Sequence, residues 1–220
     1  FLLTGPLRVV AVLLLVGLTW LLANTLFGKE SGSSVRHFFS GERSKPRPRK
    51  YKCGLSAPCP PKHLAFRLVS GAANVIRSQN LLVSSVKNNV GRGLNIALVN
   101  GVTGELLDTK NFDMWAGDVS DLLKFLRPLH EGTLVFVASF DDAATKLNDE
   151  SRRLFEELGS TAVKELAFRD SWVFVGAKGI ENKSPFEQRM KNSKSSNKYE
   201  GWPESLEMDG CIPLRPPLEG

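Results

Sequence analysis

The stretch that decides the fold reads Asn88-Asn89-Val90-Gly91-Arg92-Gly93-Leu94-Asn95-Ile96-Ala97-Leu98-Val99-Asn100-Gly101 and continues through Val102-Thr103-Gly104 to Phe112-Asp113-Met114-Trp115. Between positions 94 and 99 the side chains alternate with the period of two that is typical of a β-strand. Asn100-Gly101 and Thr103-Gly104 supply residues that accept a positive φ, so the chain can reverse there. The sequence therefore predicts a turn, a strand, a tight turn and a second strand.

A single arginine, Arg92, stands between two glycines at the start of this stretch. Gly91 and Gly93 allow a sharp turn that leaves the guanidinium group projecting from it. Taken alone, Arg92 is either a solvated turn residue or part of a binding site, and the rest of the chain must decide between these interpretations.

Composition and charge place the chain among globular proteins. It has 220 residues, 42% of them hydrophobic and 24% charged, and a net charge of +6. Much of the positive excess lies in two polar segments, Arg43–Lys52 and Lys183–Lys198, and no DNA- or RNA-binding motif is present, so we expect no nucleic-acid partner. The three cysteines and three histidines lack metal-ligand spacing, so we expect neither a metal nor a cofactor.

The N-terminal part predicts entry into the secretory pathway. Arg8 precedes an uncharged run from Val9 to Phe27, rich in Leu, Val and Ala. Residues 1–28 are therefore predicted to be a cleaved signal peptide or an uncleaved signal-anchor, and only the second would attach the protein to a membrane. Residues 29–50 are polar, basic and proline-rich, and we expect a disordered linker, whose basic end is a solvated spacer or a processing site. We expect the remainder to be secreted, where disulfides persist.

The folded domain is predicted to span residues 51–212, followed by a flexible tail at 213–220. Strand patterns are found in five segments in addition to 94–99: His63–Val69, Leu81–Val86, Glu105–Phe112, Thr133–Ser139 and Ser171–Ala177. One helix is predicted over Asp118–Leu129, and a second starts at Phe140-Asp141-Asp142 and stops at Gly159. The pattern predicts an α+β or mixed-sheet domain with helices packed on a sheet.

Three charged residues stand at the ends of predicted strands: Arg92, Asp141 and Arg169. If these ends meet at one rim, the arginines and the aspartate would offer the donors and acceptors that sugar hydroxyls need, with Trp115 or Trp172 covering the apolar side of the ring. Structural alternatives remain open for each. Asp141-Asp142 is also the pattern of a helix cap, and Arg169-Asp170 is also that of an ion pair closing a loop.

Long blocks of the chain resemble the family with sequence similarity 3, a group of secreted cytokine-like proteins that carry a GG-type lectin domain. The blocks are Tyr51–Leu55, Cys59-Pro60, Phe66–Ile76, Asn89–Gly93, Phe112–Asp118 and Phe168–Gly176. The resemblance implies a compact α+β domain of two curved, mainly antiparallel β-sheets flanked by α-helices. It also implies an unidentified cell-surface receptor, no catalysis, and a role in signalling, metabolic regulation or defence, including antimicrobial defence.

The resemblance also assigns roles to residues. Arg92, Asp141 and Arg169 match the arginine, aspartate and arginine that hold carbohydrate in sugar-binding relatives, so a glycan is an expected ligand. The family pairs its first cysteine with its third and its second with its fourth. This implies a Cys59–Cys211 disulfide. The cysteine with which Cys53 would pair is missing, because the segment Arg77–Leu82 is shorter here than in the family and contains no cysteine. Cys53 is then the odd cysteine and could form a disulfide between two chains; stable folding of the shortened segment is an open question.

Two other functions remain as alternatives to a lectin-like signalling protein. A glycosidase would need two carboxylates facing each other at ~5–9.5 Å. The candidate carboxylates are those of Asp113, Asp118, Asp141, Asp142 and Asp170. A protein-interaction module without sugar binding would need neither paired carboxylates nor a shared sugar site. Its charged residues at the strand ends would then lie far apart.

Overall fold

The computed structural model describes residues 9–10, 12–22, 51–72, 79–82, 85–87, 91–195 and 197–216, with the backbone alone for 79–82 and 85–87. The chain divides into two units, Phe1–Pro48 and Arg49–Gly220. In the first unit, residues 9–10 and 12–22 are helical. No helix among the described residues is both long and apolar enough to cross a membrane. The predicted linker at 29–50 and the last four residues of the predicted tail lie outside the described part.

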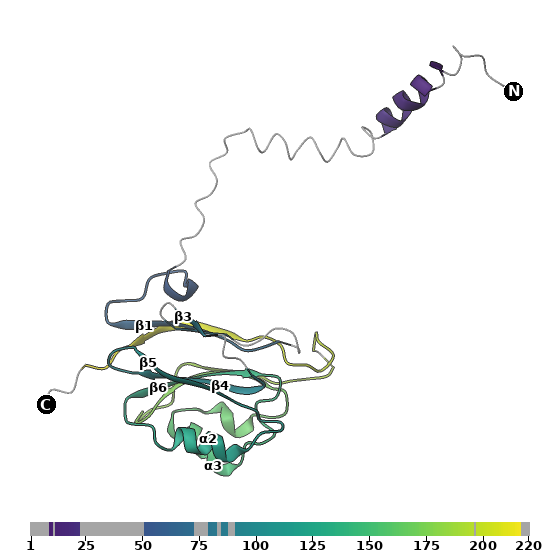
Figure 1. The fold of residues 1–220 in the computed structure, drawn as a ribbon. Coiled ribbons are helices and arrows are strands. Elements are labelled where there is room, and N and C mark those ends of the chain that lie inside the picture. The colour runs from purple at the N-terminus through teal and green to yellow at the C-terminus, as the bar shows by residue number, and fades with distance from the viewer. Residues whose placement is uncertain are drawn as a thin grey trace. The chain divides into compact units, whose positions relative to one another are not determined.

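The second unit contains two antiparallel sheets, one of four strands and one of five (Figure 1). The four-stranded sheet has the order β3-β2-β1-β9, and the five-stranded sheet has the order β5-β4-β6-β7-β8. The strands are β1 (His63–Val69), β2 (Gln79–Leu82), β3 (Ser85–Lys87), β4 (Gly93–Asn100), β5 (Leu106–Phe112), β6 (Thr133–Phe140), β7 (Ser171–Ala177), β8 (Glu187–Met190) and β9 (Glu207–Pro213). This confirms the α+β class and the two antiparallel sheets.

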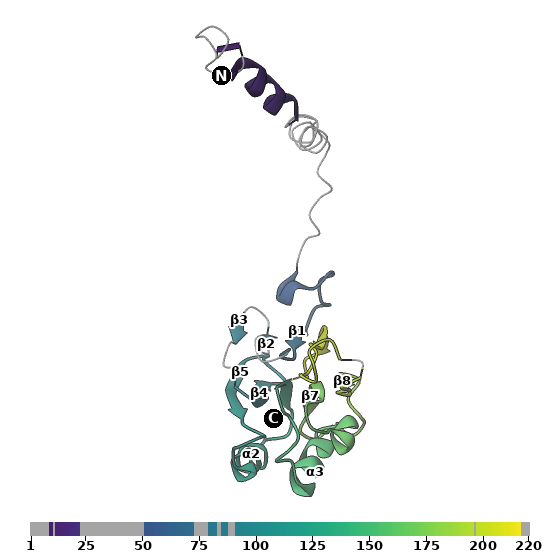
Figure 2. The same cartoon turned by 90° about the vertical axis from the view of Figure 1, so that its right-hand side faces the viewer.

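Helices cover one face of the five-stranded sheet and the four-stranded sheet covers the other (Figures 1 and 2). The helical elements on that face are α2 (Val119–Leu126), α3 (Asp149–Glu157) and the short 3-10 helix η2 (Ala162–Glu165). A further 3-10 helix, η1 (Lys52–Gly54), lies beside β1 instead. On β4, Leu94 and Ile96 pack toward the helices, and Ala97 and Val99 pack toward the second sheet. The strand is buried on both faces, and this is why it is apolar at nearly every position.

The central strands and the first helix are confirmed, with small shifts at their ends. Asp118 caps α2 by accepting a 2.8 Å hydrogen bond from the Ser120 amide. The single strand predicted over Leu81–Val86 is instead two short strands, β2 and β3, which pair with each other. Positions 77 and 78 of the shortened segment lie outside the described residues, while the backbone of β2 pairs with β1 from Phe66 to Val69.

The predicted start of the second helix is wrong, because α3 begins at Asp149 rather than near Phe140. Asp141 has a φ of +59°, which a right-handed helix does not tolerate. The Asp142 carboxylate then accepts the amides of Ala144 and Thr145 within a loop. The helix starts only where Asn148 and Ser151 form a reciprocal capping box.

The C-terminal part contributes two strands that the sequence patterns do not predict. β9 pairs with β1 along its whole length, and β8 forms one edge of the five-stranded sheet. The implied disulfide between Cys59 and Cys211 is present and ties β9 to the loop that precedes β1. A cross-link over a separation of 152 residues removes much loop-closure entropy from the unfolded chain.

Cys53 lies beside this disulfide in a small apolar cluster with Leu55 and Ala65. Its thiol is buried and donates a 3.3 Å hydrogen bond to the Ala65 carbonyl oxygen. A disulfide between two chains through Cys53, which the resemblance left open, would first require this cluster to expose the sulfur.

Candidate functional site

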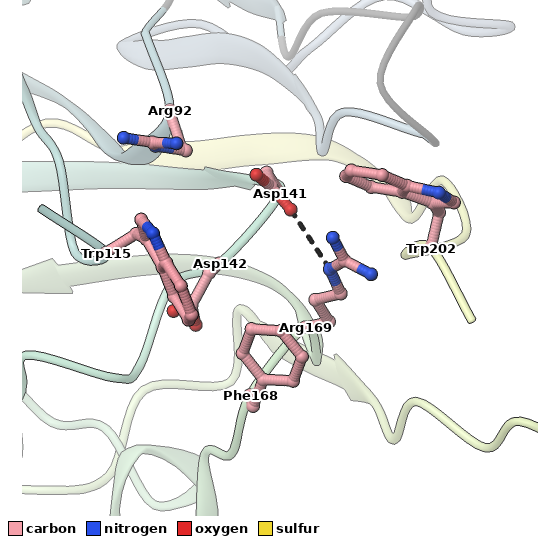
Figure 3. Close-up of a pocket in the computed structure, with 7 residues that line it drawn as sticks. All are labelled: Arg92, Trp115, Asp141, Asp142, Phe168, Arg169 and Trp202. Carbon is pink, nitrogen blue, oxygen red and sulfur yellow. Dashed lines mark hydrogen bonds and ion pairs between the residues drawn. The ribbon is translucent and has the colours of Figure 1, made fainter.

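The three charged residues predicted from the sequence line one pocket of about 240 Å³ at an end of the five-stranded sheet (Figure 3). The pocket is formed by residues from the turn before β4, the loops after β5 and β6, the loop before β7, and the segment between β8 and β9. Its lining consists of Arg92, Trp115, Asp141, Asp142, Phe168, Arg169 and Trp202. The antiparallel order of these strands places all these segments at the same end of the sheet.

The Gly91-Arg92-Gly93 turn is closely packed, and at Gly93 the backbone approach and the positive φ require glycine. A Cβ on Gly91 would lie 2.1 Å from Nδ2 of Asn111, and a Cβ on Gly93 would lie 2.0 Å from a backbone oxygen of β5. Gly93 also has a φ of +101°. The buried Asn95 side chain accepts from the Gly91 amide and donates to its carbonyl, each at 2.9 Å. The turn therefore holds the backbone of Arg92 at the pocket rim.

Arg92 forms a two-pronged ion pair with Asp113. Its Nη2 lies 2.6 Å from Asp113 Oδ2, and its Nε lies 3.1 Å from each carboxylate oxygen. These hydrogen bonds raise the pKa of Arg92 and, aided by the amides of Trp115 and Ala116, lower the pKa of Asp113 to about 2. Asp113 thus connects the arginine to the turn that carries Trp115.

Asp141 and Arg169 line the pocket as a contacting pair, and both stand at strand ends with unusual backbone geometry. Both have a positive φ, 59° for Asp141 and 60° for Arg169. Such conformations cost free energy outside glycine and are concentrated at functional sites. Nε of Arg169 donates to Oδ1 of Asp141 at 3.2 Å, and both side chains are mostly buried (Figure 3).

Aromatic rings surround the Arg169 guanidinium group. Its central carbon lies 3.6 Å from the centre of the Trp202 ring and 5.0 Å from that of Phe168. The Phe168 ring in turn lies 5.7 Å from that of Trp115. Trp115 and Phe168 remain 50% and 47% exposed. Large exposed aromatic faces beside fixed polar groups match the apolar and hydroxyl faces of a sugar ring.

Asp142 and Asp170 directly follow Asp141 and Arg169 in the chain, and Asp142 lines the pocket whereas Asp170 does not. Asp170 is buried and accepts hydrogen bonds from Nε of Arg189 at 2.8 Å and from the amides of Ala167 and Asn192 at 3.0 and 2.8 Å. The ion pair that closes this loop is thus made by Asp170 with Arg189, while Arg169 remains directed to the pocket. Asp142 is 1% exposed, and among the described residues its Oδ2 has no hydrogen-bond partner.

The sequence identified Trp115 but misplaced Trp172, which lies in the core with its indole nitrogen bonded to Glu187. Sequence reasoning also missed Trp202, Phe168 and Asp113 as members of the site or its direct support. An isolated tryptophan following a basic, polar segment was the available signal for Trp202, since such a segment supplies no core for it. Phe168 directly precedes Arg169 but gave no periodic signal.

No group of three or more His, Cys, Asp or Glu side chains is placed to hold a metal ion in the part of the chain that the structure describes. Four of the five candidate catalytic carboxylates are held in ion pairs or a helix cap: Asp113 and Asp141 with arginines, Asp170 with Arg189, and Asp118 at a helix N-terminus. The fifth, Asp142, accepts two backbone amides through Oδ1. The pKa of Asp118, like that of Asp113, is lowered, in its case by hydrogen bonds from Ser120.

Comparison with known proteins shows to which family this chain is related. The family model described as interleukin-like EMT inducer matches residues 92–180, from the pocket arginine to just beyond β7. The chain is 65% identical to protein FAM3A of Mus musculus, with 97% of each chain covered. It is 51% identical to protein FAM3D of Homo sapiens, with 97% of this chain and 98% of the relative covered, and 50% identical to human protein FAM3C, with 96% and 97% covered. The family inferred from the sequence blocks is therefore confirmed, and the chain belongs to the FAM3 family.

Proposed function

We propose that this chain is a secreted, cytokine-like signalling protein that acts through a cell-surface receptor. Membership of the FAM3 family and the match to an interleukin-like domain support this role. The uncharged N-terminal run and the Cys59–Cys211 disulfide fit passage through the secretory pathway. Expression of the full chain in cultured cells tests this: the domain should appear in the medium, and retention in the membrane fraction would contradict secretion.

We further propose that the domain binds carbohydrate in the pocket lined by Arg92, Asp141 and Arg169. The observation that carries the proposal is that these three residues, which are distant in sequence, line one pocket together with exposed aromatic rings. A volume of about 240 Å³ suits one small ring or the end of a longer chain. It lies below the ~300–1,000 Å³ of pockets for drug-sized ligands.

Binding would rely on positioned donors and acceptors rather than on a reaction. Arg92 and Arg169 donate to sugar oxygens, Asp141 accepts from hydroxyl groups, and the faces of Trp115 and Phe168 cover the apolar side of the ring. The contacts of Arg92 with Asp113 fix the guanidinium before a ligand arrives, which lowers the entropy cost of binding.

The ionisation of Asp113 and Asp118 favours a non-catalytic domain over a glycosidase that would use either of them as its acid. A glycosidase needs a general acid whose pKa is raised, whereas the pKa of Asp113 is held at about 2 and that of Asp118 is also lowered. Incubation of the protein with aryl glycosides and glycan substrates tests this point, and release of a reducing sugar would overturn it.

A glycan array probed with the purified full-length protein tests the carbohydrate proposal. We expect binding to a defined set of glycans, and we expect Arg92→Ala to reduce it at least about tenfold, because a charge-assisted hydrogen bond contributes ~1.5–3 kcal/mol. Arg127→Ala is the matched control, since Arg127 is exposed and pairs with Glu150 outside the pocket. No bound glycan with the fold intact would remove the lectin role and leave the signalling role standing.

The exposure of Trp115 and Phe168 also supports a second candidate, direct contact with a protein receptor. Exposed aromatic residues are frequent anchors of protein interfaces. Trp115→Ala separates the two. If a receptor alone uses this surface, the variant should lose signalling in responsive cells while the unmodified protein shows no glycan binding.

A further inference from the structure

A second, smaller cavity shares Arg169 with the pocket described above. Its volume is about 100 Å³. It is formed by the start of β7, the end of β8 and the segment that follows β8. Its lining consists of Arg169, Ser171, Met190, Lys191, Asn192, Ser193, Asn197 and Glu204. The two cavities therefore meet at one guanidinium group.

Arg169 has donors to offer on this second side. An arginine carries five N–H donors, and the only hydrogen bond of this side chain among the described residues is the one from Nε to Asp141. Because Arg169 lines both cavities, its two terminal nitrogens are the donors that a group in the second cavity would meet. The stacking of Trp202 at 3.6 Å holds the plane of the guanidinium group in place.

Most of the other polar side chains of the cavity are used to hold its wall. Nδ2 of Asn197 donates to Oδ1 of Asn192 at 2.7 Å, and Nδ2 of Asn192 donates to the Gly201 carbonyl oxygen at 2.9 Å. The Ser171 hydroxyl donates to the carbonyl oxygen of Glu204. These groups build a rigid frame, so they contribute shape rather than available donors.

The groups that remain available carry positive charge. Lys191 is exposed and makes no ion pair or hydrogen bond with any residue in the described part of the chain. The Glu204 carboxylate, the one acidic group in the lining, already has Nζ of Lys198 at 3.8 Å. Arg169 and Lys191 are therefore the donors that an incoming group would meet.

The charge balance of the first pocket is different. There Arg92 pairs with Asp113, Arg169 with Asp141, and Asp142 adds a further carboxylate. The first pocket thus suits a neutral ring, and the second suits a group that accepts hydrogen bonds and carries negative charge.

We propose that the second cavity is a subsite for an acidic substituent, a carboxylate or a sulfate, on the glycan whose neutral ring occupies the first pocket. Arg169 would contact both parts of the ligand, and Lys191 would contact the acidic group alone. This inference rests on the proposed carbohydrate binding and specifies the class of glycan: acidic oligosaccharides rather than neutral ones.

Equilibrium binding to paired glycans tests the proposal. The probes are the neutral disaccharides cellobiose, N-acetyllactosamine and chitobiose, each compared with a sulfated and a carboxylated form, which separates the two possible substituents. We expect one acidic form to bind about three- to tenfold more tightly than its neutral parent at low salt, as for a charge-assisted contact. That preference should shrink at high ionic strength, because salt screens exposed charges.

Two variants locate the effect. Lys191→Ala should weaken the preference, since only Arg169 then contacts the acidic group, and should leave the affinity for the neutral parent unchanged. Lys194→Ala should leave both unchanged, because Lys194 is exposed on the same segment and lines neither cavity. Equal affinity for neutral and acidic forms, or a preference that Lys191→Ala does not diminish, overturns the second subsite alone. Binding to none of the probes or array glycans overturns the carbohydrate proposal and this inference with it.

Discussion

Arg169 and Asp170 are adjacent in one loop, yet they belong to two different regions of the molecule. Arg169 points into the pocket and uses one of its five donors, at 3.2 Å from Asp141. Asp170 does not line the pocket, is 1% exposed, and accepts from Arg189 and from two backbone amides. The first residue keeps its hydrogen-bonding capacity available, and the second commits it to the fold.

Glu187 resembles Asp170 in this respect, and we call the two residues the supporting carboxylates. Glu187 accepts hydrogen bonds from the Ser160 hydroxyl, the Trp172 indole, both donors of Thr161 and the Ala162 amide. The comparison teaches that charge alone does not mark a site residue here. A carboxylate saturated by donors is structural, whereas an ion pair with unused donors is available to a ligand.

The largest expected effect on stability comes from removing one of the two supporting carboxylates, that of Asp170. Asp170→Ala leaves Arg189 without its buried partner and two amides without an acceptor. We expect the free energy of unfolding to fall by about 3–5 kcal/mol, as when one partner of a buried ion pair is removed. Chemical denaturation monitored by tryptophan fluorescence measures it.

Glu157→Ala is the control for this variant, because its exposed ion pair with Lys178, at 3.5 Å, should contribute less than about 0.5 kcal/mol. If Asp170→Ala cost no more than the control, the supporting role of Asp170 would be wrong.

A smaller effect on the free energy of unfolding, which depends on pH, is expected at the second supporting carboxylate, Glu187. Burial acts to raise the pKa of Glu187, but the hydrogen bonds from Ser160, Thr161 and Ala162 outweigh it and lower the pKa. Glu187→Gln should cost about 1–3 kcal/mol at neutral pH, because an amide donor then faces other donors. Since the folded pKa is depressed, the stabilisation is present above the unfolded pKa of about 4.3 and is lost as pH falls through the folded pKa.

Denaturant titrations of the unmodified protein and Glu187→Gln at several pH values measure this dependence. The stability gap between the two proteins should be widest near neutral pH and should narrow below pH ~4. A gap that stayed constant down to the acid limit would contradict the hydrogen-bonded carboxylate.

The smallest effect on stability is expected in the pocket. Arg92→Ala removes an ion pair that is partly exposed on both sides, so the free energy of unfolding should change little. Its effect should appear instead in the titration of Asp113, whose pKa should rise from about 2 toward 3.8 when the guanidinium is lost. NMR titration of the side-chain carboxyl measures this shift. An unchanged pKa would show that the backbone amides, rather than Arg92, hold the carboxylate ionised.

Much of the fold could be predicted from the sequence where one physical constraint dominates. The strands β1, β4, β6 and β7 follow from alternating or continuous apolar residues, and α2 follows from its apolar periodicity and the cap at Asp118. The edge strands β8 and β9 escaped prediction because both are half exposed and β8 is also short, so their pairing with β7 and β1 is a tertiary property. The start of α3 was mispredicted because Asp142 caps a loop turn in place of a helix.

The charged residues at the strand ends could be recognised in the sequence because the apolar runs that predict the strands also show where each strand ends. Arg92, Asp141 and Arg169 stand next to apolar runs, and a charged residue there must face solvent or a partner. Their ion-pair and stacking partners could not be predicted from the sequence. Asp113 is 21 residues from Arg92, Asp141 is 28 residues from Arg169, and Trp202 comes from a segment that shows no periodicity.

The sequence by itself predicted entry into the secretory pathway. It also determined the core strands, the glycine turn at Arg92 and the identity of the charged residues at the strand ends. These are local properties, set by hydrophobic period, backbone freedom and composition. Only the tertiary structure decided that three of those ends share a pocket, that Trp202 closes over Arg169, and that Asp170 turns away to bind Arg189. The physical reason is the antiparallel order β5-β4-β6-β7-β8, which brings remote loops to one end of the sheet and leaves contacts between them to packing.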